Sequence, residues 1–385
     1  MSEATAERIE TIEITGMAHG GQGVGRVDGQ VCFVSKTVVG DVVRVRIDKV
    51  EKRMLWGTLV EVETASPDRA AQPVDSAAAT WGHISYPGQA QWKQQGIKEA
   101  FKRIAGMTVD LEWDEDEDLR LGYRTRAEFR GDGENFGYHE PGTRTIVNTE
   151  HCPLCHPKLN AVLPALHEAR VKGEVTVTVN PEGDDVLIWT KRPYRRLKHR
   201  FPTANSSEDG GRRTKFILDD VPVVNGTFSQ SSLLLNRRLV SVAHQYIGGA
   251  VSLLDLYCGN GNMSIGLPQK CRVVGVDHSK DAVKAARSAS EREYRTGNEN
   301  KMKRLIKQDE WDTILLDPPR TGAKGLMSFL APCQARAIVY VSCDPATLAR
   351  DVKSLSAEGW KVKHATAIDM FPNTHHVETV CRLER

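Results

Sequence analysis

Two side chains near the C-terminus have the chemistry of a nucleophile and a general base. Cys343 stands in a Ser-Cys-Asp-Pro segment directly after an apolar stretch that predicts a strand, and a cysteine thiolate is a strong nucleophile. Glu378 precedes the last apolar strand, where a carboxylate can accept a proton. A free cysteine is more often a small core residue, but ligands bind at strand ends in open α/β sheets. The pattern therefore favours a functional role for Cys343, and Glu378 can point into the same site.

A glycine-rich turn supplies a candidate cofactor site. Residues 255–262 read Asp-Leu-Tyr-Cys-Gly-Asn-Gly-Asn and follow a predicted strand, so a ligand can approach the backbone closely. Asp277 ends the next strand, and an acid there can bind both hydroxyls of a ribose. A dinucleotide site requires a third glycine where this chain has Ser264. That difference favours another adenosine cofactor, S-adenosylmethionine.

Alternating strands and helices are expected to position these residues. Four apolar segments separated by helical stretches predict a doubly wound parallel sheet. These segments lie at 251–256, 273–276, 313–316 and 338–341. Because the carboxyl ends of parallel strands meet at one edge, Asp317 and Cys343 are expected in the same crevice.

The N-terminal region predicts a small β-barrel. Val43, Val45 and Ile47 alternate with polar residues, as in a half-buried strand. Five short strands, with glycines at their turns, fit an OB-like barrel, a fold that often binds oligonucleotides. A purely structural barrel is an equally good explanation of the pattern. The predicted strands are 12–15, 25–27, 31–34, 42–47 and 54–60.

The rest of the chain predicts two further domains. Residues 1–62 form the barrel, 63–228 a central α+β domain, and 229–385 the domain with the parallel sheet. A helix is predicted at 89–104, and the segment of about 87–105 packs on the last domain in one alternative.

Charge is balanced over the whole chain but not along it. The 52 Lys and Arg against 50 Asp and Glu argue neither for nor against a nucleic-acid partner. An acidic block at 112–118 predicts a solvated loop. The basic run from Lys191 to Arg200 surrounds one tyrosine and can hold phosphates and stack on a base, with a solvated loop as the equal alternative. The candidate RNA-binding residues are Lys191, Arg192, Arg195 and Arg196.

Composition sets the broad class. A hydrophobic share of 40% and a charged share of 26% are typical of a folded globular protein. No run of ~18 apolar residues can span a membrane, and the N-terminus lacks the features of a signal peptide. We therefore expect a cytoplasmic protein without a membrane partner. The eight cysteines are scattered, which argues against a disulfide scaffold.

Several motifs together resemble one enzyme family, the RNA uridine-5 methyltransferases that act on ribosomal and transfer RNA. They are the segment 255–262, Asp-Pro-Pro-Arg-Thr-Gly at 317–322, Ser-Cys-Asp-Pro-Ala-Thr-Leu-Ala-Arg-Asp at 342–351, the segment 371–378, Phe-Ser-Gln at 228–230 and the segment 84–95. The N-terminal barrel resembles the RNA-binding TRAM domain of that family. The resemblance covers nearly the whole chain and implies a Rossmann-like class I methyltransferase domain with a mixed seven-stranded sheet.

The resemblance implies a role for each motif. Cys343 attacks carbon 6 of uracil, carbon 5 accepts the methyl group, and Glu378 removes the proton from carbon 5. The target base must be flipped out or already unstacked. Gln230 reaches the amino-acid end of S-adenosylmethionine, and Asp317 lies near the transferred methyl group. The implied cofactor-binding residues are Gln230, Tyr257, Gly259, Asn262, Asp277, Asp309 and Asp317.

The chain departs from the family pattern in two places. Many members hold an iron–sulfur cluster on four cysteines, but residues 75–83 contain none and only Cys152 resembles one of the four. We therefore expect neither a cluster nor another metal, although Cys152 and Cys155 could bind zinc if two further ligands were present. The adenine contact should follow the third strand, where Gln308 and Asp309 are the candidates.

Several alternatives remain open at this level. The TRAM-like barrel favours ribosomal RNA as the substrate, and transfer RNA is the alternative. Methyltransferases that act on exocyclic amines carry Asn-Pro-Pro-Tyr/Phe at the fourth strand, where this chain has Asp-Pro-Pro-Arg. DNA cytosine methyltransferases place their cysteine after the fourth strand, whereas Cys343 follows the fifth. A catalytically decayed RNA-binding protein would explain the absent cluster cysteines, but such a protein needs neither Cys343 nor Glu378.

Overall fold

The computed structural model describes residues 8–140, 142–208, 213–308 and 311–385. The chain divides into two compact units, one comprising residues 1–97 with 371–376 and the other residues 98–370 with 377–385. The predicted domain boundaries at residues 62 and 228 stay a prediction.

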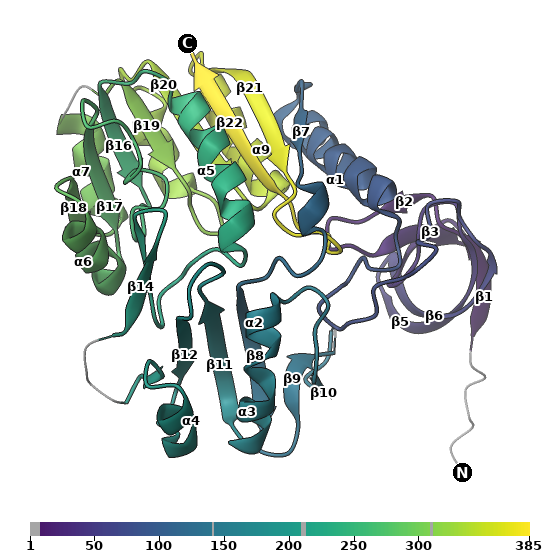
Figure 1. The fold of residues 1–385 in the computed structure, drawn as a ribbon. Helices are drawn as coiled ribbons and strands as arrows, with labels where there is room; N and C mark the ends of the chain where they lie inside the picture. Colours follow the sequence, from purple (N-terminus) through teal and green to yellow (C-terminus); the bar gives the residue numbers. More distant parts are fainter. Residues whose placement is uncertain (1–7, 141, 209–212, 309–310) are drawn as a thin grey trace. The chain divides into compact units, whose positions relative to one another are not determined.

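The first unit is built on a curled six-stranded sheet in the order β1-β5-β6-β4-β3-β2 (Figure 1). Val43 and Val45 are fully buried and Ile47 is partly buried, whereas the side chains of Arg44 and Arg46 are each 42% exposed, in agreement with the predicted alternation. The strands are β1 (Ile9–Glu13), β2 (Gly16–Met17), β3 (Gly23–Val27), β4 (Gln30–Val34), β5 (Val42–Glu51) and β6 (Met54–Thr64).

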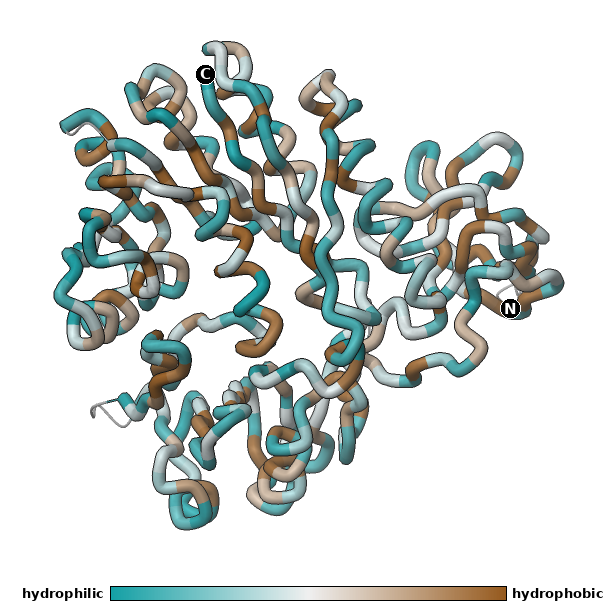
Figure 2. Tube along the Cα trace, turned by 45° about the horizontal axis from the view of Figure 1, so that its top comes forward, coloured by the Kyte–Doolittle hydropathy of each residue, from teal (hydrophilic) through white to brown (hydrophobic). Residues whose placement is uncertain are grey.

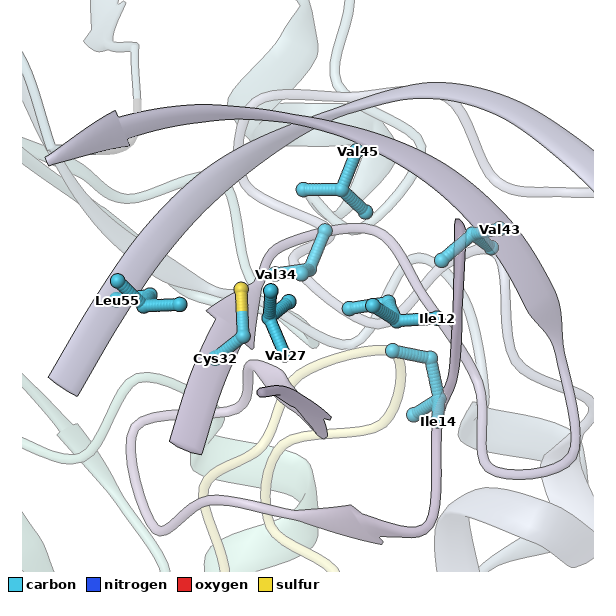
Figure 3. Packing of buried hydrophobic residues seen from close by; sticks show 8 residues of the cluster. All are labelled: Ile12, Ile14, Val27, Cys32, Val34, Val43, Val45 and Leu55. Carbon is cyan, nitrogen blue, oxygen red and sulfur yellow. The ribbon is translucent and has the colours of Figure 1, made fainter. Parts of the chain in front are cut away.

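The curled sheet encloses a small apolar core (Figure 3). Aliphatic side chains and one cysteine from five strands and the segment after β1 fill it, and burying them supplies the main driving force for folding this region. They are Ile12, Ile14, Val27, Cys32, Val34, Val43, Val45 and Leu55.

Helix α1 (Tyr86–Ala100) is followed by a π-helical turn, Phe101–Ala105, close to the predicted helix at 89–104. Its buried stripe contains Gln89, Lys93 and Ile97, spaced four residues apart on one face of the helix. Two of the three are polar, which is unusual for a buried helix face.

One layer of the second unit is a six-stranded sheet in the order β10-β9-β8-β11-β12-β13. A two-stranded hairpin follows it in the chain. The sheet strands are β8 (Arg126–Asp132), β9 (Phe136–His139), β10 (Ile146–Asn148), β11 (Lys172–Val179), β12 (Val186–Thr190) and β13 (Asn205–Ser206). The hairpin strands are β14 (Lys215–Leu218) and β15 (Val221–Val224), and the helices are α2 (Pro157–Asn160), α3 (Leu163–Glu168) and α4 (Arg195–Arg200).

An eight-stranded mixed sheet forms the largest layer of the second unit, in the order β18-β17-β16-β19-β20-β22-β21-β7. Only β22 runs antiparallel to its neighbours. The strands are β7 (Glu112–Asp114), β16 (Ser252–Leu256), β17 (Arg272–Asp277), β18 (Glu293–Thr296), β19 (Thr313–Leu316), β20 (Ala337–Ser342), β21 (Lys361–Ile368) and β22 (Glu378–Glu384). The predicted fold class is confirmed.

Two segments differ from the prediction. The start of the acidic block forms β7, which extends the expected seven strands to eight by pairing with β21. Strand β18 is the expected third strand, but the sequence did not locate it, because Glu-Tyr-Arg-Thr is short and only Tyr294 is buried in it.

Helices cover both faces of this sheet, with α5 (Leu233–Ile247) and α9 (Pro345–Ser356) on opposite sides (Figure 1). Every residue of β19 and β20 is buried, as expected for strands covered on both faces. Figure 2 shows the resulting apolar stretches along the central strands. The other helices are α6 (Lys280–Ala289), α7 (Glu299–Gln308) and α8 (Met327–Leu330). Among the described helices none is long and apolar enough to cross a membrane.

Candidate active site

The turn after β16 places backbone groups beside a carboxylate. Tyr257 and Gly259 adopt positive φ angles of 63° and 53°. The Gly259 N–H donates to Asp277 Oδ2 over 3.1 Å, and the Ser279 N–H donates to Asp277 Oδ1 over 2.7 Å. The Asp277 carboxylate is thereby fixed at the carboxyl end of β17, over the glycine turn. Such a turn with an adjacent acid can bind a nucleoside.

Ser264 occupies the place of the third glycine and has a structural partner. Its hydroxyl is fully buried, donates to Asp255 Oδ2 over 2.6 Å and lies 3.0 Å from the Tyr294 hydroxyl. Burial raises the pKa of Asp255 to about 7, and the Ser264 hydrogen bond opposes that rise. The hydroxyl thus stabilises the buried end of β16, which a glycine could not do.

Gln230 precedes α5 in the sequence, and Asn262 follows it. The segment of Gln230 is held by central-domain groups, since the N–H groups of Thr125 and Arg126 both donate to Ser231 O over 2.9 Å. Asn262 exchanges two amide hydrogen bonds with Asn236 of α5, over 2.7 and 2.9 Å. The largely buried Gln230 side chain makes no hydrogen bond with any described residue. Its amide is available to a ligand.

Asp317 follows β19 at the same edge of the sheet. Within the described ranges its carboxylate accepts no hydrogen bond. Burial raises its pKa to about 7, with a further contribution from the charge of Asp277. A carboxylate left without a donor at a strand end is suited to a ligand that brings one.

Cys343 lies between β20 and α9. Asp344 caps the helix by accepting the Thr347 N–H over 2.8 Å, and Pro345 occupies the first helical turn, so this turn is well defined. The thiol is partly exposed, whereas most of the other cysteines are buried. Burial raises the pKa of the Cys343 thiol to about 12, the charge of Glu378 adds to the rise, and the Arg320 guanidinium opposes it.

Glu378 is the first residue of β22 and is 5% exposed. None of the described residues donates a hydrogen bond to its carboxyl group. Burial, with the charge of Asp317, holds the pKa of Glu378 well above its usual range, and Arg320 opposes the shift. A buried acid with a raised pKa is a good proton acceptor once it is ionised. The structure therefore brings Cys343, Glu378 and Asp317 into mutual electrostatic contact around Arg320.

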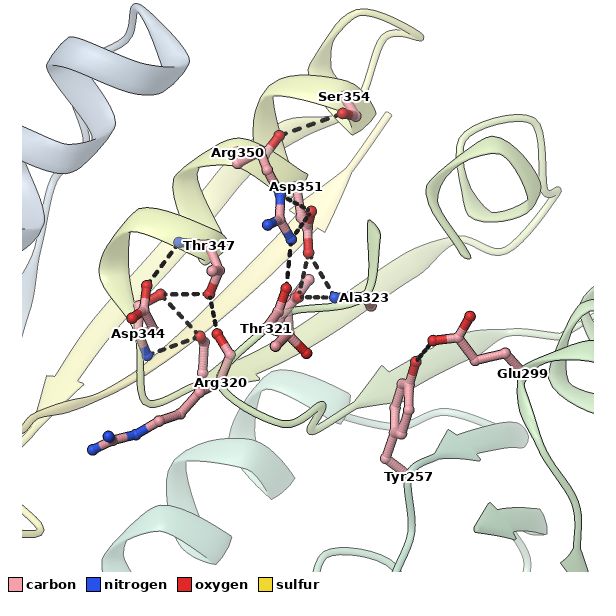
Figure 4. Close-up of polar contacts among 12 residues, drawn as sticks. Tyr257, Glu299, Arg320, Thr321, Ala323, Asp344, Thr347, Arg350, Asp351 and Ser354 are labelled. Carbon is pink, nitrogen blue, oxygen red and sulfur yellow. Dashed lines mark hydrogen bonds and ion pairs between the residues drawn. The ribbon is translucent and has the colours of Figure 1, made fainter. Parts of the chain in front are cut away.

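Arg320 is the residue at this site to which the sequence motif assigned no role. Figure 4 shows its side chain extending away from α9, while the loop that carries it is held by α9. Thr347 Oγ1 donates to Arg320 O over 3.1 Å, and Arg350 Nη2 donates to Thr321 O over 2.9 Å. The Arg320 guanidinium also acts on the Cys343 thiol, because its positive charge lowers the thiol pKa against the effect of burial.

The buried carboxylate of Asp351 completes this arrangement. It is 1% exposed, and its Oδ2 accepts the Tyr340 hydroxyl over 2.7 Å and the Ala323 N–H over 2.8 Å. Arg350 Nε donates to its Oδ1 over 2.9 Å. We call Tyr340, Thr347, Arg350 and Asp351 the α9 clamp. The α9 clamp fixes the loop of residues 320–323 against the helix that follows Cys343.

Tyr257, in the glycine turn, pairs with Glu299, a residue that the sequence did not single out. The Tyr257 hydroxyl donates to Glu299 Oε1 over 3.0 Å, as Figure 4 shows. Glu299 begins α7 just after β18, so the residues that follow the third strand of this sheet are 297–299. Gln308 is instead exposed at the end of α7. Asp309 lies outside the described residues.

The basic run forms a short helix with one buried side chain. Leu197 is 2% exposed and anchors α4, while Lys191, Arg192, Arg195 and Arg196 are exposed. The Tyr194 hydroxyl is occupied structurally, because it accepts the Lys172 N–H over 2.8 Å. The cations are thus presented to solvent, and the predicted contact of this run with RNA stays a prediction.

Cys152 and Cys155 are both buried, and the Tyr138 hydroxyl lies 3.4 Å from Cys155 Sγ. In the described part of the chain, no group of three or more His, Cys, Asp or Glu side chains could hold a metal ion. Trp81, in the segment that lacks cluster cysteines, is 3% exposed and packs with Val38 and Ile84. The predicted absence of a cluster and of zinc stays a prediction.

Two sequence families match the chain. The family described as tRNA (Uracil-5-)-methyltransferase matches residues 220–385. The TRAM domain matches residues 6–60, which contain the curled sheet up to β6.

Relatives match over nearly the full length. An uncharacterized RNA methyltransferase of Clostridium tetani is 28% identical over 95% of this chain and 94% of its own. The 23S rRNA (uracil(1939)-C(5))-methyltransferase RlmD of Vibrio cholerae is 27% identical over 96% of this chain and 94% of its own. The crystal structure of the Pyrococcus abyssi tRNA (uracil-54, C5)-methyltransferase, 24% identical, covers 97% of this chain and 100% of its own with a TM-score of 0.76, which shows a common fold.

Proposed function

Since this chain belongs to the RNA uracil-5 methyltransferase family and carries a TRAM domain, we propose that it forms 5-methyluridine in ribosomal RNA. S-adenosylmethionine is its methyl donor. The preference for ribosomal RNA is supported by the TRAM domain and by full-length relatives, such as the Vibrio cholerae enzyme, that are named for 23S rRNA. The proposal includes a cytoplasmic location, because the ribosomal RNA substrate is found there.

The donor site is supported by polar groups that lack partners within the described chain. The Gln230 amide and the Asp317 carboxylate make no hydrogen bonds there, and Asp277 lies at the edge of the glycine turn. S-adenosylmethionine supplies a methyl group on a positively charged sulfur, next to which a carboxylate is favourable. Gln230 would hold its amino-acid end, Asp277 its ribose and Asp317 the side of the methyl group. Tyr257, Gly259 and Asn262 would line the site.

The adenine side is proposed at the residues after β18. Asn298 and Glu299 lie two and three residues after the end of that strand, and Glu299 already accepts the Tyr257 hydroxyl. This assignment replaces Gln308, which lies at the far end of α7. The carboxyl ends of neighbouring parallel strands meet at the same edge, which is why a residue after β18 can serve the glycine turn after β16.

The single observation that carries the chemistry is the arrangement of Cys343 and Glu378 around Arg320. Carbon 5 of uracil is a poor nucleophile until a thiolate adds to carbon 6 and turns the ring into an enolate. Arg320 favours the Cys343 thiolate because a nearby cation stabilises the charged form. After carbon 5 has accepted the methyl group, Glu378 takes its proton, the double bond re-forms, and the bond from carbon 6 to sulfur breaks.

This arrangement argues against a decayed RNA-binding protein. Glu378 is 5% exposed and receives no hydrogen bond from the described residues, so burial costs free energy for its charged form and raises its pKa. A protein that only binds RNA gains nothing from that cost. Catalysis explains why the group is there.

Transfer RNA is the second candidate substrate. The observation that favours it is the full-length likeness to the Pyrococcus abyssi enzyme, which is named for uracil 54 of tRNA. Both candidates use the same chemistry, so only the RNA distinguishes them.

The test is mass spectrometry of nucleosides from separated ribosomal and transfer RNA, in cells with and without the gene. We expect 5-methyluridine to disappear from ribosomal RNA and to be restored by the wild-type gene but not by a Cys343→Ala gene. Its disappearance from transfer RNA alone would support the second candidate. No change in 5-methyluridine in either RNA would overturn the proposed function.

A further inference from the structure

The loop between β21 and β22 is divided between the two compact units. Residues 371–376 at its tip belong to the first unit, and the chain returns to the second unit at Val377, one residue before Glu378. At the base of the loop, Ile368 pairs with Glu378 in the sheet. The backbone that carries Glu378 is therefore continuous with a segment that folds as part of the N-terminal unit.

Gln89 of α1 holds the tip of this loop. It is 1% exposed, its Oε1 accepts the Asn373 N–H over 2.7 Å, and its Nε2 donates to Asn373 Oδ1 over 3.2 Å. The same Nε2 donates to Ile84 O over 2.9 Å. Since both ends of the amide are used, its orientation is fixed, and Asn373 is fixed with it.

Asn373 is held from a second side. The Trp81 N–H donates to Asn373 O over 2.9 Å, so the backbone N–H, the carbonyl and the side-chain oxygen of Asn373 all have partners in the first unit. Its φ angle is 64°, in the left-handed region that asparagine tolerates better than most residues. The loop tip is thus locked into one backbone conformation.

Lys93 adds a charged contact one helical turn further along α1. It is 3% exposed, and its Nζ donates to Phe371 O over 3.1 Å. A lysine is rarely so buried without a specific role for its charge. We call Gln89, Lys93, Phe371 and Asn373 the loop clasp.

We propose that Gln89 and Lys93 are positioning residues for Glu378, holding the loop that sets the place of its carboxyl group. This inference rests on the proposed function, in which Glu378 removes the proton from carbon 5. The Glu378 carboxyl has no hydrogen bond from the described residues to orient it, so its position depends on its backbone. That backbone is paired with Ile368 on one side and is joined through Val377 to the loop tip that contains Asn373 on the other.

The proposal predicts a defect in one chemical step. A displacement of about 1 Å in a catalytic group can cost on the order of 100-fold in rate. If Glu378 is displaced while Cys343 is not, attack and methylation continue but removal of the proton is slow. Enzyme bound to methylated uridine through Cys343 then accumulates.

The test uses the full-length protein with ordinary uridine RNA and S-adenosylmethionine. Gln89→Glu keeps the size of the side chain but removes the donor to Asn373, and Lys93→Met removes the donor to Phe371. The matched controls are Gln91→Glu and Lys98→Met, exposed positions on the same helix. The readouts are steady-state turnover, the fraction of protein in a denaturation-resistant RNA adduct, and alkylation of Cys343 in the free protein.

We expect the two clasp variants to turn over about 10- to 100-fold more slowly and to accumulate adduct that carries the new methyl group. Cys343 alkylation should match the wild type, and both controls should behave as the wild type throughout. Lower turnover without adduct, or unchanged turnover in both clasp variants, would overturn the inference.

A gentler variant covers the case in which neither clasp variant folds. Asn373→Gly keeps the positive φ angle and both backbone hydrogen bonds but removes the oxygen that accepts from Gln89. A several-fold rise in adduct supports the inference, and no rise overturns it. A wild-type protein that makes no 5-methyluridine would instead count against the proposed function.

Discussion

The turn at Cys343 and the loop before Glu378 hold their residues in different ways. Cys343 lies beside a capped helix, and the α9 clamp fixes the neighbouring loop with Arg320 through hydrogen bonds within one unit. Glu378 stands at the end of a loop whose tip is held by the N-terminal unit. In the proposed mechanism, attack by Cys343 and product release through Glu378 therefore depend on separate parts of the chain, and we expect substitutions to disturb them separately.

The largest effect is expected at Cys343 itself. Cys343→Ala should lower methyl transfer by at least about 10⁴-fold, because the proposed bond to carbon 6 requires its thiolate. S-adenosylmethionine binding, measured by calorimetry, should stay close to wild type, since the thiol is not among the groups proposed to hold it. Measurable turnover by this variant would remove Cys343 from the mechanism.

Glu378→Gln should block removal of the proton from carbon 5 while leaving attack by Cys343 intact. Turnover should fall by about 10²- to 10⁴-fold, with methylated adduct as the dominant species, because attack proceeds and proton removal does not. Denaturing gels with labelled RNA measure the adduct. If this variant forms no more adduct than wild type, Glu378 is not the base that releases the product.

Alkylation of Cys343 in the free protein tests the electrostatics of the attack side. With a thiol pKa of about 12, the rate should rise about tenfold per pH unit between pH 7 and 10. Arg320→Met removes a cation that favours the thiolate, so the pKa should rise and the rate at fixed pH should fall about tenfold or more. Glu378→Gln removes an anion and should shift the rate in the opposite direction. Peptide mass spectrometry separates Cys343 from the other cysteines.

Asp351→Asn should weaken the α9 clamp and lower the rate of Cys343 alkylation, but by less than Arg320→Met does. The variant keeps the size of the side chain but weakens the bonds from Tyr340 and Ala323, at a cost of about 1–3 kcal/mol in unfolding free energy. Cys343 alkylation should slow a few-fold without adduct accumulation in turnover. Adduct accumulation in the Asp351→Asn variant would mean that a change in the α9 clamp also displaces Glu378.

Much of the attack side could be predicted from the sequence. Asp277 ends an apolar strand, and Asp317 and Cys343 each follow one. Because the carboxyl ends of those strands meet at one edge, the proximity of the three residues follows from the fold class. Their chemical roles stay predictions, as do those of Gln230 and Glu378. Arg320 was visible in the motif, but its position depends on hydrogen bonds from α9 that no local pattern encodes.

The residues that the sequence did not reveal share a physical cause. Strand β18 is short and largely polar, so it lacks the apolar pattern that marks a strand, and the place of Glu299 after it was missed as a result. Strand β7 joins the sheet by pairing with β21, far away in the sequence. The loop clasp likewise joins Gln89 to Asn373 across most of the chain, and only the tertiary structure shows that pairing.

The smallest effect is expected far from both catalytic residues. Replacing Arg192, Arg195 and Arg196 together by Ala should weaken RNA binding, and the dependence of log Kd on log salt should become shallower by about 0.7–0.9 for each phosphate that the variant no longer neutralises. These cations are exposed on or beside α4, so S-adenosylmethionine binding should not change. An unchanged salt dependence would show that the run is only a solvated surface.

The most direct test of the central claim is to map the covalent bond. Wild-type protein is incubated with S-adenosylmethionine and RNA that contains 5-fluorouridine, whose fluorine cannot be removed as a proton by Glu378. The product is then digested with nuclease and protease for mass spectrometry. The account predicts a methylated fluorouridine attached to the peptide that contains Cys343. A bond to any other residue, or complete RNA methylation with no bond to the protein, would contradict it.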